Sequence, residues 1–201
     1  MSTQILYLSS SLRGADSQSS QMADEFIAMR KEAGEDLTIV HRDLNAAALP
    51  HIDGERFGAF TTPASERSSA QAAVVAESDA LIQELRDADE LIIALPMYNL
   101  GIPSTFKAWI DHVARAGETF RYTENGPVGL VGDKPVTVLA ARGGQYAGTE
   151  LDTQTLYARH IFGLMGVSNI HFIYAEGLNM GPEHASAARQ QAREAMQAQL
   201  R

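Results

Sequence analysis

Cysteine is absent from this chain of 201 residues, and so are long apolar runs. Without cysteine there are no disulfides, no thiolate catalysis and no cysteine metal site, which is typical of proteins from a reducing compartment. No segment approaches the roughly 20 apolar residues that span a bilayer, and no basic segment precedes the first apolar run. We therefore expect a soluble, cytoplasmic protein that has no contact with a membrane.

Positive charge is also scarce. Lysine and arginine together number 16 against 25 aspartates and glutamates, which gives a formal net charge of -9. A protein that binds the phosphate backbone of nucleic acid needs the opposite balance, so nucleic acid is not an expected partner. The six histidines never occur at the i, i+4 spacing of a helical metal site, and we expect no bound metal.

What the sequence does contain is a series of short apolar segments that alternate with amphipathic ones. The expected strands are residues 5–8, 37–40, 91–95, 136–140 and 170–174, and the expected helices are 20–32, 66–88, 103–115 and 183–199. The strand segments are apolar throughout, as in parallel strands that are buried on both faces. Irregular structure is expected between residues 45 and 63, where the length of the segment suggests a lid or an interface.

These elements predict one α/β domain over residues 1–201, because a chain of this length with 45% hydrophobic residues can bury a single core. Right-handed crossovers lead to a doubly wound, five-stranded parallel sheet of order 2-1-3-4-5 with helices on both faces. In such a sheet, ligands bind at the carboxyl ends of the strands, where the winding reverses. The loops after strands one, three and four should therefore meet at one site.

The first of these loops, residues 9–20, is rich in serine and leads directly into a helix. The free N–H groups and the positive dipole end of a helix N-terminus favour an anion such as phosphate. The loop lacks the GxGxxG pattern of dinucleotide sites and the Gly-Lys-Ser/Thr pattern of triphosphate sites, so a phosphomonoester fits best. The alternative is that these serines only cap the helix and form turns.

The second and third loops carry groups that suit a flat ring system. Residues 97–100 join a thioether, an aromatic ring and an amide at a strand end, although packing and a turn explain them as well. In residues 141–144, a glycine pair permits close backbone approach and Arg142 adds a fixed charge, with a plain turn as the alternative. The expected convergence of all three loops favours a binding site.

One class of enzyme and one class of regulator with this type of sheet are excluded by the same loops. A low-molecular-weight tyrosine phosphatase needs a nucleophilic cysteine in the first loop, and the chain has none. A response regulator needs an acidic cluster after strand one and a phosphorylatable aspartate after strand three, where this chain has serines and then Tyr98 and Asn99.

Taken together, the three loops resemble the flavin-binding set of the FMN-dependent NADH azoreductases, a family with a flavodoxin-like fold. The residues that carry the resemblance are Ser11 with Ser17, Gln18 and Ser19, then Pro96, Met97, Tyr98, Asn99 and Leu100, then Arg142, Gly143 and Gly144. Segments 114–117, 119–127 and 175–177 also match, so the resemblance covers nearly the whole chain. It implies non-covalent FMN as the cofactor.

By this resemblance, Ser11 and residues 17–19 bind the FMN phosphate, residues 97–100 lie along the isoalloxazine ring, and residues 141–144 meet its pyrimidine edge. The family often has serine in place of Ala141 and phenylalanine in place of Leu100. The first departure loses one hydrogen bond, worth about 1 kcal/mol, and the second removes an aromatic wall beside the flavin. These departures affect acceptor preference rather than the identity of the cofactor.

The resemblance further implies that NADH or NADPH reduces FMN, leaves, and is replaced by an azo compound or a quinone that takes two electrons. Phe120 and Tyr122 would line the space over the ring, although a local hydrophobic cluster explains them as well. A homodimer with sites at the subunit interface is expected, with Leu164 facing the neighbouring site. Because the cofactor supplies the chemistry, no catalytic acid or base is assigned to the chain.

Two alternative functions share these motifs. An FMN reductase, or a quinone reductase with no azo acceptor, would have the same residues. A flavodoxin-type electron carrier has the same fold and acidity but needs no nicotinamide pocket. Residues 45–63 and 117–132 argue against the carrier, because a bare carrier has no use for such insertions.

Overall fold

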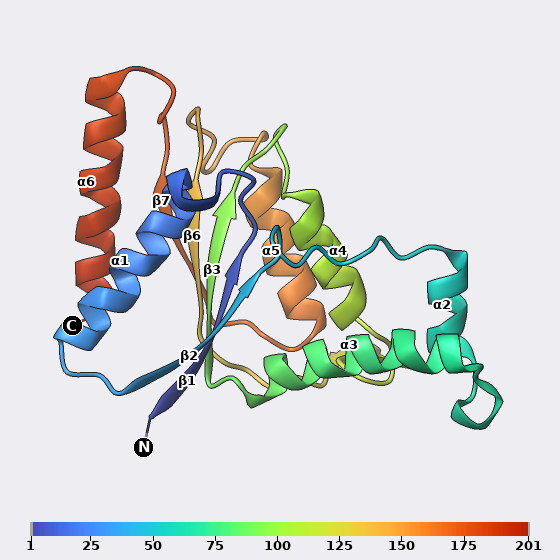
Figure 1. Cartoon of the computed structure of the whole chain (residues 1–201). Coiled ribbons are helices and arrows are strands. Elements are labelled where there is room, and N and C mark those ends of the chain that lie inside the picture. Colours follow the sequence, from blue (N-terminus) through green and yellow to red (C-terminus); the bar gives the residue numbers. More distant parts are fainter. Residues whose placement is uncertain (1, 201) are drawn as a thin grey trace.

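The computed structural model describes residues 2–200, and within them a five-stranded sheet has the strand order β2-β1-β3-β6-β7. All neighbouring pairs are parallel, and the carboxyl ends of the strands lie at one edge of the sheet (Figure 1). This is the doubly wound order predicted from the sequence. The strands are β1 (Thr3–Ser9), β2 (Leu37–Asp43), β3 (Glu90–Pro96), β6 (Val136–Ala141) and β7 (Ile170–Ala175).

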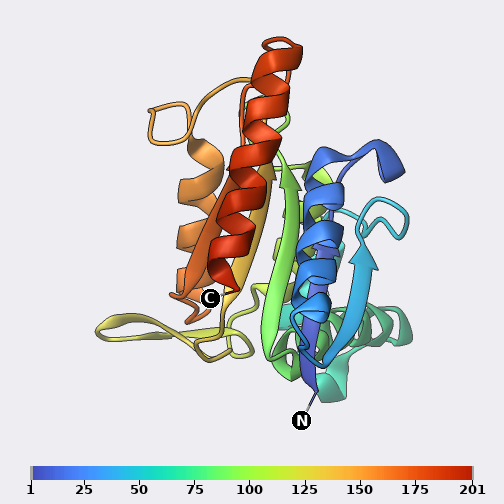
Figure 2. The same cartoon turned by 90° about the vertical axis from the view of Figure 1, so that its left-hand side faces the viewer.

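Helices cover both faces of the sheet, as expected. One face carries α1 (Gln18–Glu32) and α6 (Pro182–Gln199), and the other carries α3 (Ser69–Asp87), α4 (Ser104–Val113) and α5 (Thr153–Leu164) (Figures 1 and 2). Alternate strand residues enter separate cores: Leu6 packs with Trp109 on the α4 side, whereas Ile5 packs with Phe26 on the α1 side. Burial on both faces explains why the strand segments are apolar throughout. No helix within residues 2–200 is long and apolar enough to cross a bilayer.

The segment expected to be irregular contains a helix, α2 (Gly54–Thr61), followed by the short helix η2 (Ala64–Glu66). The Asp53 carboxylate caps α2 by accepting the Arg56 N–H at 2.8 Å, and Arg56 forms an ion pair with Glu77 of α3. Two glycines in α2 lower its intrinsic helix propensity, so its stability depends on contacts that the local sequence does not reveal. Figure 1 shows α2 beside the start of α3 and away from the carboxyl ends of the strands. It is therefore no lid over the strand ends of its own chain.

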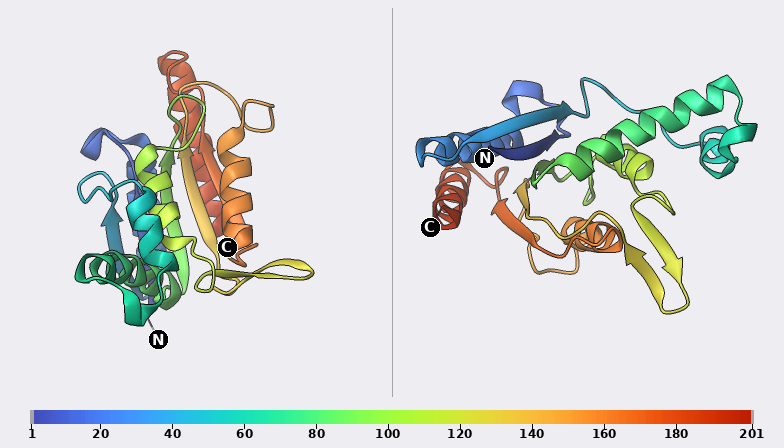
Figure 3. Two further views of the ribbon diagram at one scale, coloured as in Figure 1. Left: turned by 90° about the vertical axis from the view of Figure 1, so that its right-hand side faces the viewer. Right: turned by 90° about the horizontal axis from the view of Figure 1, so that it is seen from below.

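The segment 117–132, treated above as an insertion, contains an antiparallel hairpin of β4 (Phe120–Thr123) and β5 (Gly126–Gly129). Gly129 approaches the chain just after α5 so closely that a Cβ there would lie 2.1 Å from the Gly166 nitrogen. Because α5 ends opposite the carboxyl ends of the strands, the hairpin projects from the far end of the sheet (Figures 2 and 3). Because β5 contains glycine and proline, which are rare inside strands, its sequence does not indicate a strand.

Candidate functional site

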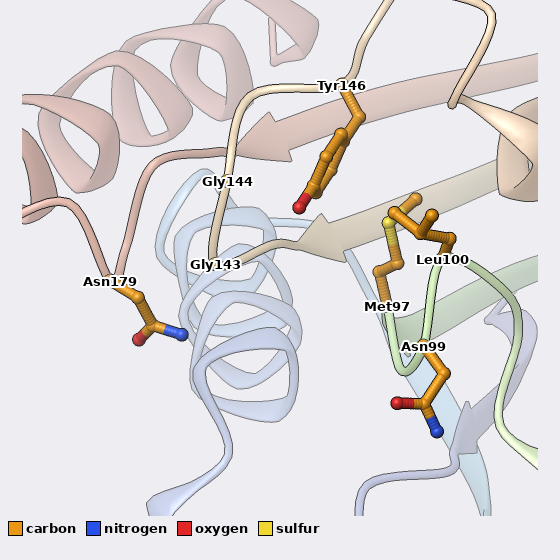
Figure 4. Close-up of a pocket in the computed structure, with 7 residues that line it drawn as sticks. All are labelled: Met97, Asn99, Leu100, Gly143, Gly144, Tyr146 and Asn179. Carbon is orange, nitrogen blue, oxygen red and sulfur yellow. The ribbon is translucent and has the colours of Figure 1, made fainter.

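Two adjoining cavities lie where the loops after β1, β3 and β6 meet. The serine cavity, of about 330 Å³, is lined by Ser11, Arg13, Asp16, Ser17, Gln18, Ser19, Pro96, Met97, Tyr98, Ala141, Arg142, Gly143, Leu178, Asn179 and Arg189. The glycine cavity, of about 490 Å³ (Figure 4), is lined by Met97, Asn99, Leu100, Gly143, Gly144, Tyr146 and Asn179. Because Met97, Gly143 and Asn179 border both, the two cavities adjoin, and together we call them the groove across the carboxyl ends of the strands.

The three predicted loops are brought together, whereas the two aromatic residues assigned to the space above them are not. Every residue that the resemblance assigns to FMN borders one of the two cavities. Phe120 and Tyr122 lie on the hairpin at the opposite end of the sheet. Phe120 is buried and meets the Tyr122 ring edge-on at 5.4 Å between centroids, while 75% of Tyr122 is exposed. Within one chain, Phe120 and Tyr122 therefore form a local hydrophobic cluster, which is the alternative to a substrate site stated above.

The first loop leads through the short helix η1 (Gly14–Asp16) into α1, and its serines are partly used as caps. The Ser17 hydroxyl accepts the Ser20 N–H at 3.2 Å and lies 3.2 Å from the Ser19 hydroxyl. A hydroxyl can accept two hydrogen bonds and donate one, so the capping role leaves these groups able to bind an anion as well. The N–H groups of Gln18 and Ser19 donate to no atom of residues 2–200. The start of α1 therefore offers unpaired donors to the serine cavity.

Tyr98 ties the first loop to the second. Its hydroxyl lies 3.0 Å from the Ser11 hydroxyl and accepts the Leu12 N–H at 3.2 Å. The Tyr98 side chain thus fixes the distance between the loops after β1 and β3. The sequence marked Tyr98 as a ring contact, and the structure adds this positioning role.

The second loop is a tight turn with an unusual backbone. Tyr98 and Gly101 exchange two backbone hydrogen bonds of 3.1 and 2.9 Å, and the residues between them have positive φ, 50° at Asn99 and 61° at Leu100. Non-glycine residues in this region cost on the order of 1 kcal/mol or more each, and such strain is concentrated at ligand sites. The Thr153 hydroxyl donates to the Leu100 carbonyl and holds the turn. Neither turn N–H has an acceptor among the described residues, so both are free to donate to a ligand.

The structure corrects the role expected for the Arg142 side chain. It is fully buried, with its guanidinium 2.7 Å from Asp152, 3.0 Å from Glu176 and 4.8 Å from the centroid of the Tyr174 ring. Two carboxylates neutralise its charge locally, so the side chain offers no fixed charge to a ligand. Only the backbone of Arg142 can border the serine cavity.

Arg142 instead holds the walls of the groove in place. Glu176, which Arg142 fixes, accepts the N–H groups of Tyr146 and Ala147, both at 2.9 Å. Gln154, which accepts from Arg142, donates to the Pro96 carbonyl of β3 at 2.8 Å. One buried cation thus links β6, the end of β7, the start of α5 and the end of β3.

Asp152 is the second carboxylate of this network, and it also caps α5 by accepting the Thr155 N–H at 3.1 Å. Burial alone would raise the pKa of Asp152, but the hydrogen bonds from Arg142 and Thr155 outweigh it and hold that pKa below its ordinary value. Asp152 therefore stays ionised at neutral pH, as the pairing with Arg142 requires.

The glycine pair presents open N–H groups because its carbonyls are used elsewhere. The Gly143 and Gly144 carbonyls accept from the N–H groups of Asn179 and Gly177 at 3.0 and 2.9 Å, and their own N–H groups have no acceptor within residues 2–200. A Cβ on Gly143 would lie 2.5 Å from the Asn179 side chain, and one on Gly144 would lie 2.7 Å from the Tyr146 hydroxyl. A side chain at either position would therefore displace Asn179 or Tyr146.

Several groove residues were not predicted. Arg189 of α6 donates to the Gln18 side chain at 2.7 Å and so brings a cation to the serine cavity. It follows Gln18 by 171 residues, and no local pattern links the two. Asn179 and Tyr146 lie two residues beyond segments that the resemblance matched, and only the fold places them in the groove. No group of histidines and acidic residues within residues 2–200 is arranged to hold a metal.

Comparisons with known proteins agree on one family. Residues 3–200 match a family model described as having a flavodoxin-like fold. The FMN-dependent NADH:quinone oxidoreductase 6 of Burkholderia lata is 51% identical over 196 residues, which are 98% of this chain and 99% of that protein. The FMN-dependent NADH:quinone oxidoreductase of Alteromonas mediterranea is 48% identical over 184 residues, 92% of each protein.

Solved structures show the same relationship. An azoreductase from Bacillus anthracis has a TM-score of 0.88 at 30% identity and covers 98% of both chains. An FMN-dependent NADH-azoreductase from the same species, solved in complex with FMN, has a TM-score of 0.87 at 25% identity over 99% of this chain and 100% of that one.

Replacing Arg142 with methionine should lower the free energy of unfolding by about 3 to 5 kcal/mol, because Asp152 and Glu176 lose the cation that compensates their burial. Urea denaturation followed by circular dichroism measures this. Arg159→Met is the matched control: Arg159 lies 5.0 Å from the Phe172 ring but is exposed, so a loss of about 1 kcal/mol or less is expected. Equal losses in both variants would contradict the role of Arg142.

Proposed function

We propose, from the membership of this chain in the flavodoxin-like family of FMN-dependent NADH:quinone oxidoreductases, that the groove across its strand ends holds FMN and admits NADH and a quinone in turn. The chain is an enzyme of that family, with FMN as cofactor and NADH as electron donor. One observation carries the proposed placement. The serine and glycine cavities adjoin and share Met97, Gly143 and Asn179, which supports one ligand with a phosphate at one end and a flat ring at the other.

The residues present fit FMN at both ends of the groove. At the phosphate end, the open N–H groups of Gln18 and Ser19 and the hydroxyls of Ser17 and Ser19 suit a terminal phosphate. At the ring end, the open N–H groups of Gly143 and Gly144 suit the acceptor atoms at the edge of a flat ring. We expect these contacts to hold FMN without a covalent bond.

When bound, FMN accepts a hydride from NADH and passes two electrons to the acceptor. The chain positions the ring and tunes it. The N–H groups of Asn99, Leu100, Gly143 and Gly144 are oriented before any ligand arrives, and they favour negative charge on the ring without reorganisation. The 97–100 turn would lie along one face of the ring, and both substrates would use the other face in turn. No side chain is assigned as a catalytic acid or base.

Quinones are the proposed physiological acceptors, because both curated relatives described above are named for them. Azo compounds are proposed as further acceptors, because the similar solved structures are azoreductases. Both are flat molecules that can stack on an open ring face. Leu100 is smaller than the phenylalanine expected from the resemblance, so the wall beside that face is lower in this chain.

We also propose a homodimer. The position of Tyr122 supports it, because this exposed ring lies too far from the groove of its own chain to serve there. Large apolar side chains are exposed on the segment 122–130 and beside the groove, namely Tyr122, Val128 and Leu130, and Leu12, Leu100 and Met180. In a dimer, the hairpin of one chain would complete the substrate space of the other. Phe120, which is buried, would support Tyr122 rather than touch a ligand.

Two alternatives remain distinct from this proposal. An FMN reductase would release its flavin as product, whereas the buried serines of the first loop favour retention. A flavodoxin-type carrier would hold FMN but take no electrons from NADH directly. A single domain over the whole chain and a cytoplasmic location stay predictions.

Anaerobic NADH should bleach the visible absorbance of the bound flavin, and a quinone added afterwards should restore it, because the two substrates use the same ring face in turn. Steady-state rates should give parallel lines in double-reciprocal plots. Stopped-flow absorbance measures the half-reactions separately, with NAD⁺ in place of NADH as the control.

A flavin that stays oxidised with NADH would identify a carrier instead of a reductase. Intersecting lines would mean that the donor and the acceptor bind together, which one open face does not allow.

Sedimentation velocity should give twice the chain mass of 21.8 kDa. Tyr122→Ala should then lower kcat/KM for a quinone by roughly threefold to tenfold through lost stacking, while ferricyanide, which needs no stacking, is reduced at an unchanged rate. A monomer with full quinone activity would contradict the dimer and the role of Tyr122 together.

Joint replacement of Ser17 and Ser19 with alanine should weaken FMN binding by about 1 to 3 kcal/mol through lost phosphate hydrogen bonds. Riboflavin, which lacks the phosphate, should bind as before. Flavin fluorescence titration measures both affinities.

Ser68→Ala is the control for lost capping, because Ser68 accepts the Gln71 N–H at 3.2 Å at the start of α3, as Ser17 does in α1. It should lower stability by about 1 kcal/mol and leave FMN affinity unchanged. If the double variant behaves in the same way, the serines only cap the helix.

A further inference from the structure

Tyr146 is an aromatic hydroxyl in the glycine cavity that neither the family comparison nor the sequence assigns to any role. Its ring stands between the loop after β6 and the 97–100 turn, with the hydroxyl directed toward Gly143 and Gly144 (Figure 4). The hydroxyl would lie 2.7 Å from a Cβ on Gly144, so the absence of a side chain at that glycine is what admits it. It hydrogen-bonds to no atom of residues 2–200 and is therefore free to donate to a ligand.

The backbone of Tyr146 is held on both sides. Its N–H donates to Glu176 at 2.9 Å, and its carbonyl accepts the Thr149 N–H at 3.0 Å and the Thr149 hydroxyl at 2.8 Å. Glu176 is in turn fixed by the buried Arg142 at 3.0 Å. A loop that only connects β6 to α5 does not need this support, whereas a donor that must point at a ligand does.

The hydroxyl is grouped with two other unpaired donors. The N–H groups of Gly143 and Gly144 border the same cavity and have no acceptor within residues 2–200. Three donors at one edge favour an acceptor that becomes negatively charged, because hydrogen bonds to an ionised acceptor are roughly twice as strong as those between neutral groups. The flat ring of FMN gains electrons and negative charge during turnover.

We propose that the Tyr146 hydroxyl donates a hydrogen bond to the edge of the FMN ring and, with the N–H groups of Gly143 and Gly144, binds the reduced ring more tightly than the oxidised one. Tyr146 thereby raises the reduction potential of the bound flavin. This inference rests on the proposed function, since it takes the glycine cavity as the ring site. Arg142 and Glu176 are positioning residues for this donor.

Tyr146→Phe keeps the ring and removes only the hydroxyl. The variant should bind oxidised FMN within about twofold of the parent protein and reduced FMN about tenfold more weakly, the difference expected for one hydrogen bond to a charged acceptor. For a two-electron couple, a tenfold change in this ratio lowers the potential by about 30 mV. Equilibration with a redox dye during slow enzymatic reduction measures the potential without NADH.

Tyr157→Phe is the matched control. Tyr157 is a half-buried phenol of α5, and burial together with nearby Asp111 raises its pKa to about 12, but it borders neither cavity. Removing its hydroxyl should leave the potential unchanged. An unchanged potential in Tyr146→Phe, or an equal shift in both variants, would overturn the proposal.

The two proposals can fail separately. If NADH does not reduce the flavin of the parent protein but Tyr146→Phe still lowers the dye-measured potential, the proposed function is wrong and the role of Tyr146 stands. If NADH reduces every variant and the potentials are equal, the function stands and Tyr146 has no part in tuning the ring.

Discussion

The buried guanidinium of Arg142 is the group on which the geometry of the groove depends. A cation with no exposed surface is tolerated only when paired, and here Asp152 and Glu176 supply the pairing from α5 and from the end of β7. Each carboxylate then does a second task, since Asp152 caps α5 and Glu176 binds the loop that follows the glycine pair. The charge therefore fixes the relative positions of elements far apart in the sequence without reaching the ligand itself.

A second consequence concerns the polarity of the groove. The carbonyls of residues 142–144 are all occupied by N–H groups from the segment after β7, and the N–H groups of Gly143 and Gly144 are left over. The 97–100 turn shows the same pattern. Tyr98 and Gly101 bond to each other through their backbones, while the N–H groups of the residues between them stay open. Two loops of unrelated conformation thus present open N–H groups to the groove. A chain with a net charge of -9 builds in this way a site of hydrogen-bond donors for the acceptor atoms of a ring.

Much of this architecture could be predicted because parallel strands buried on both faces leave a distinct trace in the sequence. The five sheet strands were placed within three residues at each end, and their order followed from right-handed crossovers. The helix α2 and the hairpin β4–β5 were missed for a common reason. Glycines in both segments weaken the sequence patterns that indicate a helix or a strand. Both elements also depend on residues far along the chain: α2 on Glu77 and the hairpin on Gly166. The topology also brought the three loops together, yet it could not show that Arg142 points inward, that Leu100 takes a positive φ, or that Arg189 reaches Gln18. These features are set by tertiary contacts.

The contact between Gly129 and Gly166 constrains how this protein could be altered. The two backbones are in direct contact there with no side chain between them, so the base of the hairpin is held in a fixed position. The tip of the hairpin, beyond Thr123, projects away from the rest of the chain. A library that diversifies the tip can vary length and chemistry without disturbing the sheet, whereas a change at either glycine would displace the whole arm. Evolution faces the same asymmetry: the tip is open to change, whereas a side chain at either glycine would meet the backbone of the other segment.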